Sequence, residues 1–146
     1  MSIPRAALPL PLLLFAAALP LHAQTALTDA QSAYLGAHVF DRQVAVFREY
    51  CAQDPAGTQA IDTGVAQFRI NNPDYVAARA DTPDSDEFKA AVAAFDAQFD
   101  QVAQTMRTQL AERPVGPQCA TLGDELRKAR FASLLEEAKQ RSAATP

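Results

Sequence analysis

Histidine and cysteine are scarce in this 146-residue sequence, which contains two of each. His22 lies in an apolar amino-terminal stretch that we expect to be removed, so His38 is the only imidazole of the expected mature chain. A single histidine cannot form a multi-histidine zinc site, and no carboxylate cluster at ligand spacing accompanies it. The sequence also lacks the C-x-x-C-H motif of covalent haem attachment and a G-x-S-x-G nucleophile elbow. We therefore predict no catalytic residue, no metal and no cofactor.

An excess of basic charge is lacking as well. The chain has 13 basic and 17 acidic residues, and loss of the amino-terminal stretch removes only Arg5, which leaves 12 − 17 = −5. A mildly acidic surface argues against nucleic acid and anionic membrane as main partners. Such a surface favours solubility or the binding of a basic partner. The acidic residues between 81 and 87 do not match the spacing of an EF-hand calcium loop, and they favour the start of a helix instead.

No apolar run is long enough to span a membrane. Arg5 and the amino terminus form a short positive region, followed by an uncharged stretch of mainly Leu, Ala and Phe over residues 6–19. A spanning helix needs ~20 apolar residues, whereas this layout is typical of a secretory signal with cleavage near Ala23. We expect residues 1–23 to be a cleavable signal peptide without a stable membrane anchor. Residues 24–146 then form a single domain that is periplasmic or secreted.

Both cysteines, Cys51 and Cys119, lie in the expected mature chain. An even pair in a small exported domain is most simply a disulfide, and neither residue belongs to a C-x-x-C redox motif. The bond would close a loop of 119 − 51 = 68 positions. Loop-closure entropy assigns about 4 kcal/mol to such a bond.

Apolar residues between 33 and 51 follow helical spacing. They recur in alternating steps of four and three residues, at Ala33, Ala37, Phe40, Val44, Phe47 and Cys51. This pattern predicts one helix that packs side by side with others. Thr28 and Gln31 match a capping box at its start, and residues 54–57 form a stop signal.

Three larger side chains, Tyr34, Val46 and Tyr50, lie off the main stripe of this helix. Apolar side chains in such positions form a candidate contact face for a partner or a homodimer seam. The alternative is that they pack under the second segment of the chain.

Residues 58–71 give mixed signals. The first apolar residues are spaced as on a helix, whereas residues 66–71 alternate between apolar and polar side chains, as in a short strand. A lone strand would have no partner, so we predict a helix, with an irregular segment as the alternative. Proline at the first position predicts a further short helix over residues 73–80.

The segment from Pro83 to Glu112 has the strongest helical pattern. Its apolar residues recur every three or four positions, at Phe88, Val92, Phe95, Phe99, Val102, Met106 and Leu110. Thr82 suits the cap of this helix. A last helix is expected over residues 118–141, with an apolar face that shifts partway along, and residues 142–146 are expected to fray.

These segments predict an all-α fold, a small antiparallel helical bundle of about four helices with one disulfide. With helices that run up, down, up and down, Cys51 ends the first helix and Cys119 begins the fourth at the same end of the bundle. The two sulfurs can therefore meet.

Two pairs of residues define alternative functions. His38 and Met106 could hold haem, but they lie at about 20 Å and 9 Å from the cysteine end of their helices at ~1.5 Å per residue. Asp96 and Asp100 lie one helical turn apart and could act as the carboxylates of a glycosidase, although such spacing is typical of a solvated face. These pairs suggest two functions other than protein binding: a ligand- or haem-carrying bundle and a carboxylate-dependent hydrolase.

The stretch Leu27-Thr28-Asp29-Ala30-Gln31 resembles the L-T-x-x-Q motif of the Spy/CpxP group of periplasmic stress chaperones, small helical proteins that bind unfolded clients. The match covers five residues and coincides with the capping box, so we do not assign the chain to that group. The lack of catalytic motifs, the amphipathic helices and the acidic surface predict an exported, non-enzymatic protein that binds a partner protein, as a chaperone, inhibitor or immunity protein does.

Overall fold

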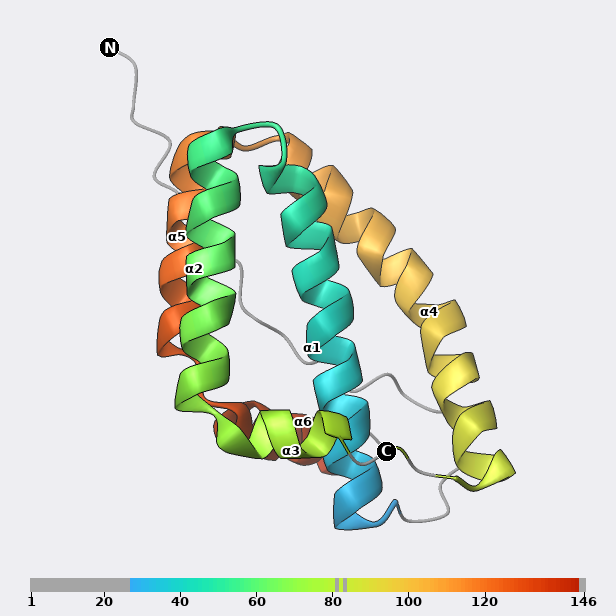
Figure 1. Ribbon diagram of the computed structural model, residues 1–146. Coiled ribbons are helices and arrows are strands. Elements are labelled where there is room, and N and C mark those ends of the chain that lie inside the picture. The colour runs from blue at the N-terminus through green and yellow to red at the C-terminus, as the bar shows by residue number, and fades with distance from the viewer. Residues whose placement is uncertain (1–26, 81, 83, 145–146) are drawn as a thin grey trace.

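The computed structural model describes residues 27–80, 82 and 84–144. In this part of the chain there are six helices and no strand: α1 (Asp29–Cys51), α2 (Pro55–Asn71), α3 (Pro73–Ala80), α4 (Asp86–Ala111), α5 (Val115–Lys128) and α6 (Phe131–Ala144) (Figure 1). The all-α class is confirmed, and the structure contains the expected disulfide. The number of helices differs from the four expected. The expected signal peptide, residues 1–23, lies outside the described residues.

The extra helices arise from two breaks in longer helical segments. Asn72 leaves the helical conformation, with φ −130° and ψ 72°, and Pro73 then begins α3. The helices predicted over residues 58–71 and 73–80 are therefore confirmed. Ala129 is extended, with φ −61° and ψ 144°, and it separates α5 from α6. The single helix expected over residues 118–141 is wrong, and the shift in its apolar face marks the break.

Helix caps explain where α1 and α4 begin. Thr28 and Gln31 form the expected capping box, with backbone-to-side-chain hydrogen bonds of 3.0 and 3.1 Å. The cap of α4 is Ser85, whose hydroxyl accepts a 3.2 Å hydrogen bond from the Phe88 amide. The helix therefore starts at Asp86, later than the start at Pro83 that the Thr82 cap predicted. Pro83 itself lies outside the described residues.

The chain consists of two similar halves, α1–α2–α3 and α4–α5–α6, each with a long helix followed by two shorter ones. Pro55 corresponds to Pro114, at a separation of 114 − 55 = 59 positions, and the same separation relates several other identical residues: Gly57 and Gly116, Gly64 and Gly123, Phe40 and Phe99, Arg48 and Arg107. The turns after α1 and α4 also use equivalent hydrogen bonds, from Asp54 N to Cys51 O and from Arg113 N to Leu110 O. We did not predict this internal repeat from the sequence.

Corresponding helices of the two halves lie parallel and side by side. Contacts between α1 and α4 keep an almost constant separation in sequence, as in His38 with Asp96 and Glu49 with Arg107. Consecutive long helices are antiparallel, and α3 and α6 lie together at the end of the bundle opposite the disulfide (Figure 1). The four longer helices of the chain therefore run up, down, up and down as expected, and in addition the two halves pair with each other in parallel.

Two glycines allow α2 and α5 to approach closely. A Cβ atom added to Gly64 would lie 2.7 Å from the carbonyl oxygen of Gly123. A Cβ atom added to Gly123 would lie 2.5 Å from the carbonyl oxygen of Ala60. Real Cβ atoms do not come so close to a backbone oxygen. Glycine at both positions therefore sets the distance between these two helices.

The predicted apolar faces form the core. Most residues of the two stripes are buried: Ala37, Phe40, Val44, Phe47 and Cys51 on α1, and Phe88, Phe95, Phe99, Met106 and Leu110 on α4. Aromatic rings join three helices to α1, since Phe40 stacks on Phe68 with ring centroids 4.2 Å apart and Tyr75 packs edge-on against both Phe40 and Phe131. This aromatic cluster anchors α3 and α6 to the middle of α1 and the last turn of α2.

Candidate functional site

The residues singled out for chemistry meet where α1 packs against α4. His38 Nε2 lies 2.7 Å from Asp96 Oδ1, and Arg42 contacts Asp96 at 3.2 Å and Asp100 at 2.8 Å. We call these four residues the α1–α4 polar seam. Each helix contributes two residues one turn apart, and the parallel alignment of the helices brings the two pairs to the same height.

The geometry of this polar seam suits helix packing better than catalysis. A glycosidase needs one carboxyl group free to protonate the leaving group and a second carboxylate opposite it. Here one guanidinium bridges Asp96 and Asp100, and the same guanidinium lies 5.1 Å from the centre of the Phe99 ring. Both carboxylates and the imidazole are therefore occupied by partners within the chain.

The two residues considered for haem lie far apart. Met106 is ten residues beyond Asp96 on α4, a rise of about 15 Å, and it is 7% exposed in the core. His38 contacts Asp96, so it lies about 15 Å along α4 from Met106. The two side chains cannot bind one iron atom from opposite sides.

A second polar cluster, which we missed in the sequence, joins α1 to α3. The Tyr75 hydroxyl donates a hydrogen bond to Asp41, and Arg79 Nε lies 2.8 Å from the other carboxylate oxygen of Asp41. Burial raises the pKa of Tyr75 well above its usual range, and the hydrogen bond to Asp41 raises it further. The phenol therefore remains a hydrogen-bond donor, and the cluster fixes α3 against α1.

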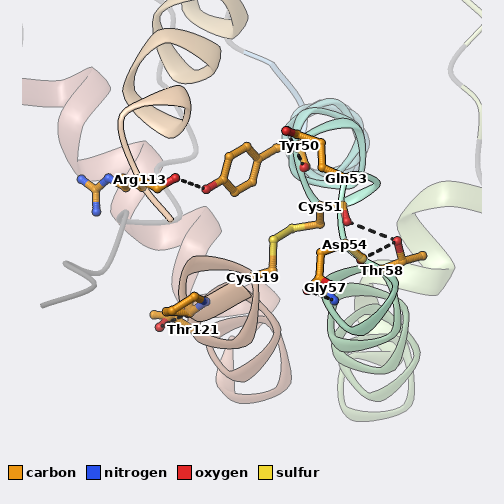
Figure 2. The surroundings of a disulfide bond; sticks show 10 residues. Tyr50, Cys51, Gln53, Asp54, Gly57, Thr58, Arg113, Cys119 and Thr121 are labelled. Atoms are coloured by element: carbon orange, nitrogen blue, oxygen red, sulfur yellow. Dashed lines mark hydrogen bonds between the residues drawn. A yellow bond between two sulfur atoms is a disulfide. The ribbon is translucent and has the colours of Figure 1, made fainter. Parts of the chain in front are cut away.

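The residues predicted as a contact face do not form one. Val46 is 3% exposed and Tyr50 is 8% exposed. The Tyr50 hydroxyl donates a 2.9 Å hydrogen bond to the carbonyl oxygen of Arg113, beside the Cys51–Cys119 disulfide (Figure 2). Tyr34 is half-buried, and Phe88 packs edge-on against its ring. The alternative, packing under the second segment, does not describe the two tyrosines either, because Tyr34 packs against α4 and Tyr50 against the turn before α5.

Neither a metal-binding cluster nor a membrane-spanning helix is found among the described residues. No group of three or more His, Cys, Asp or Glu side chains in residues 27–80, 82 and 84–144 is arranged to hold a metal ion. No helix in this part of the chain is both long and apolar enough to cross a membrane.

Among the described residues, the most exposed large apolar side chain lies at the end of the α2–α5 pair. Ile70, in the last turn of α2, is 73% exposed. Four exposed basic residues lie at the same end: Arg69 on α2, Arg127 and Lys128 in the last turn of α5, and Arg130 just after it. We call these five residues the Ile70 patch.

Hydrogen bonds between the two turns hold the Ile70 patch together. Asn71 Nδ2 donates to the carbonyl oxygen of Arg127 at 3.2 Å. Asn72 is 3% exposed; its amide group donates to the carbonyl oxygens of Phe68 and Ala129 and accepts a 2.8 Å hydrogen bond from the Phe131 amide. The buried amide thus ties the end of α2 to the turn between α5 and α6. One apolar and four basic exposed residues therefore lie at this end of the two helices.

No relative identifies this chain. No protein-family model matches it, and comparisons with curated proteins and with solved structures find no match.

Sequence reasoning missed the Ile70 patch because its two parts lie about sixty residues apart. The basic run 127–130 was visible, and Ile70 lies off the apolar face that includes Ile61 and Phe68. Only the parallel alignment of α2 and α5 brings the two parts together. The internal repeat was the signal that could have shown this alignment.

Proposed function

We propose that this chain is an exported, non-enzymatic protein that binds a partner protein through the end of its α2–α5 pair. The observation that carries the proposal is Ile70, a large apolar side chain that is 73% exposed on a well-fixed helix end. Burial of such a side chain in an interface contributes about 1.5–3 kcal/mol. Arginine, which is enriched at binding hot spots, lies beside it.

Two further features support binding rather than catalysis. The candidate catalytic groups of the α1–α4 polar seam, His38, Asp96 and Asp100, are bound to one another or to Arg42. The binding surface, in contrast, lies on the most closely packed pair of helices, α2 and α5, which the disulfide links to α1. A rigid surface loses little conformational entropy on association.

Affinity capture from the periplasm of the source organism tests this proposal. The immobilised wild-type protein is compared with Ile70→Asp and with Ala56→Asp, which adds the same charge at the other end of α2, about 21 Å away. We expect one stoichiometric partner with the wild type and with Ala56→Asp, and its loss with Ile70→Asp.

Circular dichroism of each variant shows whether its helices remain folded. Equal recovery of the partner by both variants would contradict the proposed surface. Absence of any stoichiometric partner of the wild type would contradict the proposed function.

A further inference from the structure

We infer that the Ile70 patch recognises an acidic segment of a partner protein, in which carboxylates flank an apolar side chain. This inference rests on the proposed function and adds the chemistry of the partner. It also replaces the basic partner that the overall charge of the chain suggests.

Two of the four basic residues of the Ile70 patch have no acidic partner among the described residues. Arg69 and Arg130 make no ion pair there, whereas Arg127 pairs with Asp124 of its own helix and the charge of Lys128 acts on Glu125. Elsewhere, most arginines on the described helices are paired across or along helices, as Arg48 is with Asp62 and Arg107 with Glu49. The charges of Arg69 and Arg130 are therefore available to a ligand.

Helix dipoles account for the position of the basic residues of the Ile70 patch. Basic side chains near the carboxyl ends of α2 and α5 interact favourably with the exposed carbonyl groups there, and Arg130 Nη1 donates to the carbonyl oxygen of Ala129 at 3.2 Å. This effect does not explain Ile70, because an exposed isoleucine gains nothing from the dipole. An apolar side chain among cations matches a ligand that is both apolar and acidic.

The charge of the rest of the chain favours one orientation of such a ligand. Without residues 1–23 the chain has a formal charge of −5, and setting aside the four cations of the patch leaves −5 − 4 = −9 for everything else. An acidic segment is repelled by the remaining surface and attracted at this end only. A basic partner would instead be attracted to many places and repelled from Ile70.

A short protein segment fits this surface better than an anionic membrane does. Interactions between exposed charges fade beyond about 8–10 Å at physiological ionic strength. A segment of a few residues contacts the patch alone. A flat membrane would also approach acidic residues outside the patch, such as Asp74 at the start of α3.

The experiment titrates the isotope-labelled protein with three synthetic peptides by NMR. The first peptide alternates glutamate and leucine, and the others replace glutamate with glutamine or with lysine. We expect the glutamate peptide alone to shift amide signals, with the shifts confined to residues 67–73 and 124–131. Raising NaCl from ~50 to ~300 mM should weaken this binding several-fold, because exposed charges are screened.

A matched pair of variants separates this inference from a general charge effect. Lys128→Glu should weaken binding of the glutamate peptide about tenfold. Lys89→Glu makes the same change at an exposed lysine on α4 and should leave binding unchanged. Binding of all three peptides alike, equal effects of the two variants, or binding of phosphatidylglycerol vesicles without binding of the glutamate peptide would overturn the inference.

The proposed function has a separate outcome. One outcome is that Ile70→Asp abolishes capture of a natural partner while Lys128→Glu and salt leave that capture unchanged. In that case the proposed binding of a partner protein is supported, and the inference that the bound segment is acidic is wrong.

Discussion

Replacement of Gly64 by alanine tests whether the glycines hold α2 and α5 at their observed distance. The new Cβ atom would lie 2.7 Å from the carbonyl oxygen and 3.0 Å from the Cα atom of Gly123, whereas ordinary contact needs 3.4 Å or more. Backbone atoms of a packed helix cannot turn aside as a side chain can, so the helices must separate. Overpacking of this kind costs about 1–3 kcal/mol. Alanine regains up to ~1 kcal/mol through its higher helix propensity.

Gly116→Ala is the control for this prediction. Gly116 lies in the first turn of α5, and the nearest atom to its added Cβ would be 3.9 Å away, on the Asp54 carboxylate. Both variants gain helix propensity, but only Gly64→Ala creates the close contact. We expect urea denaturation to show Gly64→Ala less stable than Gly116→Ala by about 1–3 kcal/mol. With an m value of roughly 2 kcal/mol/M, a 2 kcal/mol difference moves the midpoint by about 1 M. Equal midpoints for the two variants would refute the role assigned to the glycines.

Three further predictions concern the disulfide and two polar side chains. Reduction of the Cys51–Cys119 bond, which spans 68 positions, should lower the free energy of unfolding by about 4 kcal/mol, and a urea midpoint that reductant leaves unchanged would contradict it. Asn72→Ala should cost about 2–4 kcal/mol because it removes three hydrogen bonds and leaves backbone groups unpaired in the interior; the neighbouring Asn71→Ala, at a half-buried position, is the control, and a similar loss for both would count against this reading. Burial raises the pKa of Glu125 above 4.5, so the folded protein holds this proton to higher pH than the unfolded chain does. Stability relative to Glu125→Gln should therefore be greatest at low pH and fall as pH rises above about 4.5, and a pH-independent difference in urea midpoints would show that the carboxyl is not perturbed.

Elements with local signals were predicted well. The start of α1 depends on the Thr28 side chain and the next turn, and its apolar stripe needs only helical spacing, so both follow from residues close together in the sequence. The start of α4 was placed too early because Thr82 and Ser85 are both good caps. The structure uses Ser85, with Asp86 and Glu87 in the first turn.

Features that depend on contacts between the halves were not predicted. No proline or glycine marks the break at Ala129; the buried side chain of Asn72 accepts a hydrogen bond from the Phe131 amide and thereby fixes it. Tyr50 was misplaced because α1 has neighbours on more than one side, and a single apolar stripe identifies only one of them. The same limitation applies to the Ile70 patch, which requires the alignment of α2 with α5.

Parallel pairing of the two halves has a consequence for how the chain folds during synthesis. The face of α2 that contains Gly64 meets α5 only after residue 123 has been made, and Cys51 has no cysteine to pair with until Cys119 follows. The contacts between α2 and α5 and the disulfide thus join residues far apart in sequence, and such contacts form slowly. We expect the face of α2 that meets α5 to stay uncovered until the second half of the chain is present. A truncated chain that ends before α5 would therefore expose the residues that the complete protein buries between α2 and α5.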